Sequence, residues 1–284
     1  MPPLDQHFED DKPRREKEMS FIEHLEELRW HIFRSITAIF IIALALFILK
    51  GVVFDFLIFG PTRPDFPTYK ILCSISEKMG IGKAFCFETF NFNIINIEVA
   101  GQFLVHLKVS FILGLIVAFP YIFWEFWRFI SPALYENEAR TTKGVVFFTS
   151  LLFLIGIFFG YYVLTPFSIN FFSNYGVSDL VANQWKLTNY VSTVTMIVLA
   201  SGILFELPMI VYFLSKVGLL TPSIMRTHRK HALIINLIIS AIITPADVGT
   251  QILVSIPVVF LYELSIGISG RVHKNRMKKL AQEH

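Results

Sequence analysis

Residues 101–123, GQFLVHLKVSFILGLIVAFPYIF, form an apolar run in which Lys108 is the only charged side chain. An α-helix rises about 1.5 Å per residue, so a run of this length can cross the roughly 30 Å hydrocarbon core of a bilayer. The whole chain of 284 residues shares this character, with 54% hydrophobic and 17% charged residues. Soluble domains carry about 25% charged residues. The composition therefore predicts one integral membrane domain built from helices.

Six segments have the apolar character of membrane-spanning helices. They are residues 30–49, 101–123, 144–165, 191–214, 231–243 and 251–270. The last two are short or interrupted, because Thr244-Pro245 ends the fifth and Pro257 lies within the sixth. We expect these two to form one helical hairpin that rests against its neighbours. The predicted fold class is an all-α integral membrane protein with six transmembrane helices, of which the last two are short.

Polar segments flank these spans. Residues 1–18 are predicted to be a disordered polar extension, residues 19–270 the membrane domain, and residues 271–284 a basic tail that binds anionic lipid. The first 29 residues contain no short apolar core with a small-residue cleavage site, so we expect no cleavable signal peptide. A net charge of only +3 gives no indication of the strongly basic surface that nucleic-acid-binding proteins carry.

The distribution of Lys and Arg predicts the orientation in the membrane. Six spans place both termini on one side, and the polar segments on that side carry 17 Lys and Arg residues, against six in the opposite loops. Loops rich in Lys and Arg remain in the cytoplasm. We therefore expect both termini to be cytoplasmic.

Both cysteines of the chain, Cys73 and Cys86, lie in the long loop between the first two predicted spans. This loop faces the outside, which is an oxidising compartment in bacteria and permits disulfides. We expect a disulfide between them; two buried thiols are the alternative.

An acidic segment, EHLEELR at residues 23–29, stands immediately before the first span. Ser20 and Glu23 match a helix capping box, and Glu23 and Glu27 lie one helical turn apart on the polar side. Because acidic residues contribute little to topology, carboxylates at this position are suited to attract a cationic ligand. The helix is expected to lie partly in the interface before it turns into the bilayer. The alternative interpretation is a solvated charged face.

A second acidic segment, FISPALYENEAR at residues 129–140, follows the second span. Here Glu136 and Glu138 are expected to face water near the membrane. An ordinary connecting loop would show the same pattern.

The order of three motifs resembles that of TatC, the multispanning subunit of the twin-arginine protein translocase. They are HLEELR at residues 24–29, SPALYENE at residues 131–138, and TPAD at residues 244–247 with Gln251 and the later pairs at residues 256–257 and 262–263. The third motif has Ala246 where the family more often has a second proline. The resemblance covers residues 19–270 and six spans.

The resemblance implies a receptor and core scaffold that exports folded proteins across the bacterial inner membrane with the energy of the proton gradient. Glu27 and Glu138 match the family acids that contact the arginine pair of a signal peptide, and Arg29 matches the arginine of the same motif. Glu26, Glu136 and Glu23 are secondary positions that would steer the peptide. No metal, cofactor or enzymatic activity is expected.

The resemblance also implies partners. Thr244 and Gln251 would meet across the turn of the last hairpin and contact single-span subunits, TatA or TatB, in a homo-oligomeric receptor complex. A gap-free placement of the resemblance would put Asp179 where the family has an outer-face glutamate. Glu206, within the fourth span, is a functional candidate as an ionisable group at membrane depth, with a structural pairing as the alternative.

Two other function classes compete with this interpretation. A secondary transporter of small solutes typically shows inverted repeats, and no convincing repeat relates the two halves of the chain. A membrane-embedded enzyme needs a nucleophile with a positioned base, and no predicted span contains a convincing set.

Overall fold

The computed structural model describes residues 21–78, 80, 86, 92–130, 142–178, 180–244 and 248–282. The longer helices are α1 (Phe21–Ile48), α4 (Gly101–Ile130), α5 (Thr142–Phe159), α7 (Leu187–Phe205), α10 (Arg229–Ile243) and α11 (Val248–Gln282). Shorter helices are α2 (Lys50–Val52), α3 (Pro67–Lys78), α6 (Thr165–Asn174), α8 (Leu207–Val217) and α9 (Pro222–Thr227). Wider or tighter turns occur at η1 (Val53–Ile58), η2 (Gly60–Thr62) and η5 (Gly160–Leu164), and two strands at β1 (Asn93–Ile95) and β2 (Gln184–Lys186).

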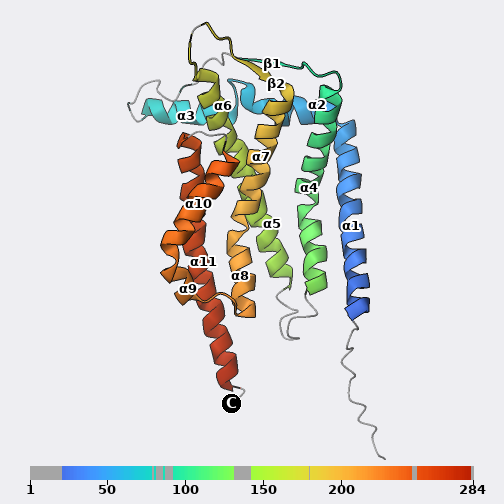
Figure 1. Cartoon of the computed structure of the whole chain (residues 1–284), viewed down its shortest axis with the longest axis vertical. Helices are drawn as coiled ribbons and strands as arrows, with labels where there is room; N and C mark the ends of the chain where they lie inside the picture. The colour runs from blue at the N-terminus through green and yellow to red at the C-terminus, as the bar shows by residue number, and fades with distance from the viewer. Residues whose placement is uncertain are drawn as a thin grey trace, which may run out of the picture.

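The long helices stand roughly side by side (Figure 1). Helix α1 flanks α4 at one edge of the bundle, while α10 and α11 lie toward the other. The upper end in Figure 1 carries α3, β1 and β2. The lower end carries the start of α1, the ends of α4 and α8, and the end of α11. The first described residue and the C-terminal helix end are therefore at the same end of the bundle.

Within the part of the chain that the structure describes, five helical segments are long and apolar enough to cross a membrane. They are Leu25–Ile48, Gly101–Ile130, Gly144–Asn174, Leu187–Val217 and Val248–Lys278. The chain is thus a multi-pass membrane protein, as the composition predicts. Helix α10 has only 15 residues, which gives a length of about 22 Å and is too short for the ordinary hydrocarbon core.

The prediction that the last span is short was wrong. Helix α11 is continuous for 35 residues and passes through Pro257 into the basic segment. Proline has no backbone N–H group, so it removes one hydrogen-bond donor from the helix. A membrane helix tolerates this loss because neighbouring helices can satisfy the backbone group that is left without a partner. The Lys and Arg residues beyond Gly270 are good helix formers and favour the C-terminal end of the helix dipole.

The all-α prediction also needs a small correction. Strands β1 and β2 form a two-stranded parallel sheet at the upper end, with Ile94 opposite Trp185. Beside this pair, the Trp185 ring stacks on Phe92 with centroids 3.9 Å apart. Three-residue strands are too short to show an alternating pattern in the sequence.

The seam between α1 and α4 has a small-residue contact near its middle. A Cβ added at Gly114 would stand 2.9 Å from the Cβ of Ala43 and 3.0 Å from the carbonyl oxygen of Ile39. Nearer the upper end, the rings of Phe47 and His106 stack with centroids 3.9 Å apart. The two helices are therefore held close together over much of their length.

A second close seam joins α5 to α7. Gly156 and Gly160 form a G-x-x-x-G pattern, which permits helix backbones to approach within a membrane. A Cβ at Gly156 would lie 2.6 Å from the carbonyl oxygen of Ser201 and 2.8 Å from the Cα of Gly202. The backbones of α5 and α7 therefore approach closely at this seam.

Candidate functional site

The first turns of α1 carry four of the predicted site residues, and the structure describes the side chains of three of them. Glu26 and Arg29 form an exposed ion pair with N and O 3.4 Å apart, and their side chains are 63% and 70% accessible. Such exposed pairs contribute little to stability, so both side chains remain available to a ligand. Glu27 is half-buried on the same helix.

The structure does not describe the side chains of the remaining predicted acids of this site. Glu136 and Glu138 fall in residues 131–141, and only the backbone of Glu23 is described, as part of α1. Helix α4 ends at Ile130, eight residues before Glu138 in the sequence. The lower ends of α1 and α4 are neighbours (Figure 1), so the two acidic segments adjoin neighbouring helices.

The predicted turn between the acidic segment and the first span is absent. Helix α1 continues from Phe21 to Ile48 without a break. The apolar side chains of Leu25 and Ile32 on this helix are 48% and 49% exposed. In a membrane protein these apolar side chains can meet lipid, while a polar stripe of the same helix turns toward α4.

That polar stripe consists of Glu27, His31 and Arg34, spaced four and three residues apart on one face of α1. It leads to Glu125 of α4, whose side chain is almost completely buried. Nδ1 of His31 lies 2.5 Å from Oε2 of Glu125, and the Tyr121 hydroxyl donates to Oε1 at 2.9 Å. A guanidinium nitrogen of Arg34 lies 3.9 Å from Oε2. The carboxylate is thus supported on both oxygens.

Glu125 is absent from the site predicted from the sequence, although a signal was present. Glu125 and Arg128 are the only acidic or basic residues in the last ten positions of α4. An ionisable group near the end of an apolar helix normally needs a partner. Its partner His31 continues the polar side of α1 one turn after Glu27, which the acidic motif alone does not reveal.

The last hairpin is joined by a ladder of polar contacts. The Asn236 amide donates to the Ser255 carbonyl at 3.1 Å, and the Ser255 hydroxyl donates to Ser240 at 3.2 Å. Thr244 is buried and donates to the Ser240 carbonyl at 2.8 Å, whereas Gln251 donates to the Leu237 carbonyl at 3.2 Å. Both predicted partner-contact residues therefore lie on this hairpin, and each donates to the backbone of α10.

Glu206 marks the junction between α7 and α8. Its backbone adopts φ −75° and ψ −6°, and Pro208 follows in the first turn of α8. The residue is half-buried, and Oε1 has no hydrogen-bond partner among the described residues. Asp179 lies outside the described residues.

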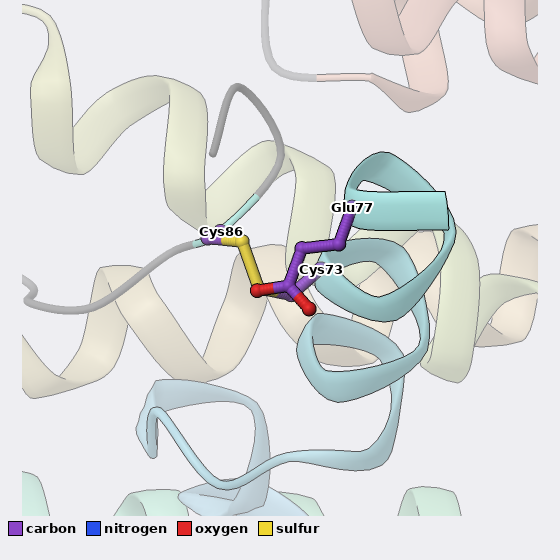
Figure 2. Close-up of a disulfide and its surroundings, with 3 residues drawn as sticks. All are labelled: Cys73, Glu77 and Cys86. Atoms are coloured by element: carbon purple, nitrogen blue, oxygen red, sulfur yellow. A yellow bond between two sulfur atoms is a disulfide. The ribbon is translucent and has the colours of Figure 1, made fainter. Parts of the chain in front are cut away.

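The expected disulfide between Cys73 and Cys86 is present (Figure 2). It ties α3 to the segment that follows, at the upper end of the bundle. Glu77 lies one turn after Cys73, with Oε1 3.9 Å from Sγ. These three side chains cluster like metal ligands, but sulfur atoms joined to each other are not the thiolates that bind metals.

Comparison with known proteins identifies the family to which this chain belongs. The family model described as "Sec-independent protein translocase protein (TatC)" matches residues 23–257. The chain belongs to the TatC family. TatC is a component of a protein translocase, so the chain is a transport protein and not an enzyme.

Individual TatC relatives match over nearly their whole length. The TatC protein of Blattabacterium sp. subsp. Periplaneta americana is 39% identical over 260 residues, which cover 91% of this chain and 98% of the relative. The TatC protein of Aquifex aeolicus is 32% identical, with coverage of 92% and 99%. A solved structure described as "Crystal Structure of Twin Arginine Translocase Receptor- TatC in DDM" aligns with a TM-score of 0.68 at 33% identity, over 87% of this chain and 99% of the other.

Proposed function

We propose that the lower end of the bundle is a receptor surface for twin-arginine signal peptides of folded cargo. Glu27 and Glu138 would contact the two arginines, and Arg29 would complete the motif. Glu26, Glu136 and Glu23 would steer the peptide toward them. The observation that carries this proposal is the polar stripe of α1, in which Glu27 lies one turn before His31, the residue that contacts Glu125 of α4, in a chain similar to a solved twin-arginine translocase receptor.

The chemistry of the arginine side chain supports this assignment. A guanidinium group offers a planar fork of N–H donors that pairs bidentately with a carboxylate, whereas a lysine ammonium acts as a point charge. Such contacts gain strength in the partly desolvated headgroup zone, where charges are screened less than in water. Two carboxylates from neighbouring segments would therefore favour consecutive arginines over lysines.

We propose that the lower end faces the cytoplasm of a bacterium and that the protein lies in its inner membrane. The excess of Lys and Arg in the lower-end segments supports this orientation. Helix α10 would count as a sixth, short span, because α11 returns from its end to the lower end (Figure 1). Both termini would then be cytoplasmic.

The last hairpin is the proposed contact for TatA and TatB, the single-span partners, within a homo-oligomeric complex. Thr244 and Gln251 belong to a polar ladder that a partner helix with a polar group could extend. Hydrogen bonds between membrane helices contribute about 0.6–2 kcal/mol, which permits exchange of partners. The proton gradient would supply the energy. No feature of the described residues favours a small-solute transporter.

Binding of a labelled twin-arginine signal peptide to the purified protein in lipid nanodiscs tests the receptor role. Glu27→Gln and Glu138→Gln remove a charge with little change in shape, and each is expected to weaken binding about tenfold. The control is Glu263→Gln, which breaks the Arg229–Glu263 ion pair at 2.8 Å between α10 and α11. Unchanged binding by the double variant Glu27→Gln/Glu138→Gln would refute the acidic site.

A further inference from the structure

The buried contact between His31 and Glu125 lies next to the proposed signal-peptide site. His31 is one helical turn after Glu27 on α1, and Glu125 lies five residues before the end of α4. The two residues are 7% and 1% exposed. This cluster is therefore closed to a peptide, but it joins the two helices that the acidic segments adjoin.

Helix α1 needs such a contact because it is a peripheral helix of the bundle. Only 17% of its most apolar window is buried, and its packing within the described chain is mainly on α4. In lipid, apolar side chains gain little by facing each other instead of acyl chains. The rotation and height of α1 against α4 must therefore come from close small-residue contacts and from directional hydrogen bonds.

At the lower end of the bundle, the His31–Glu125 contact is a directional hydrogen bond of this kind. Both oxygens of the carboxylate are used, one by His31 and one by Tyr121 of α4. The His31 ring also meets Phe129 edge-on, with centroids 6.0 Å apart. The imidazole thus contacts two residues that are one turn apart on α4, which fixes the rotation of α1.

We infer that His31 and Glu125 are positioning residues for signal-peptide binding: they set the rotation of α1 on α4 and thereby the place of Glu27. This inference rests on the proposed function. The pair acts through geometry, so the hydrogen bond matters and the charge of Glu125 does not. Substitutions that keep a hydrogen bond should preserve binding, and substitutions that remove it should not.

Three variants separate these roles. Glu125→Gln keeps an oxygen that can accept from His31 and an amide that can reach Tyr121. The double variant His31→Leu/Glu125→Leu replaces the whole pair by apolar side chains, which avoids an unpaired buried charge and favours a folded protein. Glu263→Gln is the control at a separate ion pair.

Two readouts are measured in nanodiscs: affinity for the twin-arginine peptide, and electron-spin distances between labels at Leu25→Cys and Arg128→Cys without peptide. Both label positions are exposed, and the native cysteines are joined in the disulfide and do not react. We expect the double variant to bind about tenfold more weakly with a broadened distance distribution, a coupling typical of residues in one network. Glu125→Gln and Glu263→Gln should match the unmodified protein in both readouts.

Normal affinity and unchanged distances in the double variant would overturn the inference. Equal losses in Glu125→Gln and the double variant would also overturn it, because the charge would then matter. If the unmodified protein binds no peptide, the proposed receptor role fails. The distance readout then still decides whether this pair sets the geometry of α1 on α4.

Discussion

At the scale of single residues, the lower end of the bundle combines charged side chains at the start of α1 with a buried pair, His31 and Glu125, that joins α1 to α4. Glu26, Glu27 and Arg29 occupy the start of α1, and the two cysteines are joined. Glu125 was missed because its partner His31 is 94 residues away in the sequence. Pairing between distant residues follows from the packing of helices, which no local pattern records.

Tyr69 of α3 gives a prediction about pH. The residue is buried outside the membrane spans, and its hydroxyl donates to the Pro61 carbonyl at 2.8 Å. Burial raises the pKa of the Tyr69 hydroxyl above its ordinary value of 10.0. The folded state thus holds this proton more tightly than the unfolded state. Its contribution to stability is complete below about pH 10 and is lost as the pH rises further.

Thermal unfolding in detergent from mildly to strongly alkaline pH tests this prediction against Tyr69→Phe. Near neutral pH the variant should be less stable by about 1 kcal/mol for the lost hydrogen bond. Above about pH 10 the free energy of unfolding of the unmodified protein should fall faster than that of the variant, by up to about 1.4 kcal/mol per pH unit. Parallel pH profiles of the two proteins would contradict the assignment.

At the level of helices and strands, the apolar runs predicted the long helices, but not where each one ends. Helix α11 passes Pro257 because its neighbours support it, and β1 and β2 pair across a long stretch of sequence. Both features depend on surroundings that a window of sequence does not contain. The short α10, by contrast, agrees with the charged pair Arg229-Lys230, at which it begins, and with Thr244-Pro245, which follows its last residue.

The close contact between α5 and α7 predicts that replacing a glycine by alanine costs much more stability at this seam than at an open position. Gly156→Ala places a methyl group against the backbone of Ser201 and Gly202 and should destabilise the bundle by about 1–3 kcal/mol. A Cβ at Gly267 in α11 meets no atom within 4 Å, so Gly267→Ala should be neutral or slightly stabilising. The stability of each variant is measured as the folded fraction that remains during heating in detergent. Equal stability of the two variants would show that the seam between α5 and α7 can accommodate an added methyl group.

The hairpin of α10 and α11 makes a separate prediction about partners. Gln251→Leu removes the bond to the Leu237 carbonyl and the polar group available to a partner helix. Crosslinks to TatA and TatB should fall more than crosslinks to a signal peptide. The reverse order would place the partner contact elsewhere, and Ile252→Leu, at an exposed neighbour, is the matched control.

For the molecule as a whole, the membrane character and the family followed from composition and three ordered motifs. The start of α1 and the end of α11 lie at the same, lower end of the bundle (Figure 1). The shape of the bundle, with α1 at its edge and α3 across its upper end, could not be predicted. It depends on close helix contacts that many apolar sequences could satisfy in other ways.

The N-terminal extension gives a prediction for the whole chain. Residues 1–17 precede both α1 and the family match, which begins at residue 23. Their deletion should therefore leave export of a twin-arginine reporter unchanged. The measurement is the exported fraction of reporter in cells at equal protein levels, and a loss of export would assign a function to the extension.

Photocrosslinking from positions 27 and 138 to a twin-arginine signal peptide is the decisive experiment for the receptor role, with a twin-lysine peptide as the control. We expect crosslinks from both positions that appear with Arg-Arg and fade with Lys-Lys. Absence of crosslinks in inserted, folded protein, or equal crosslinks to both peptides, would contradict a receptor site built on these two carboxylates.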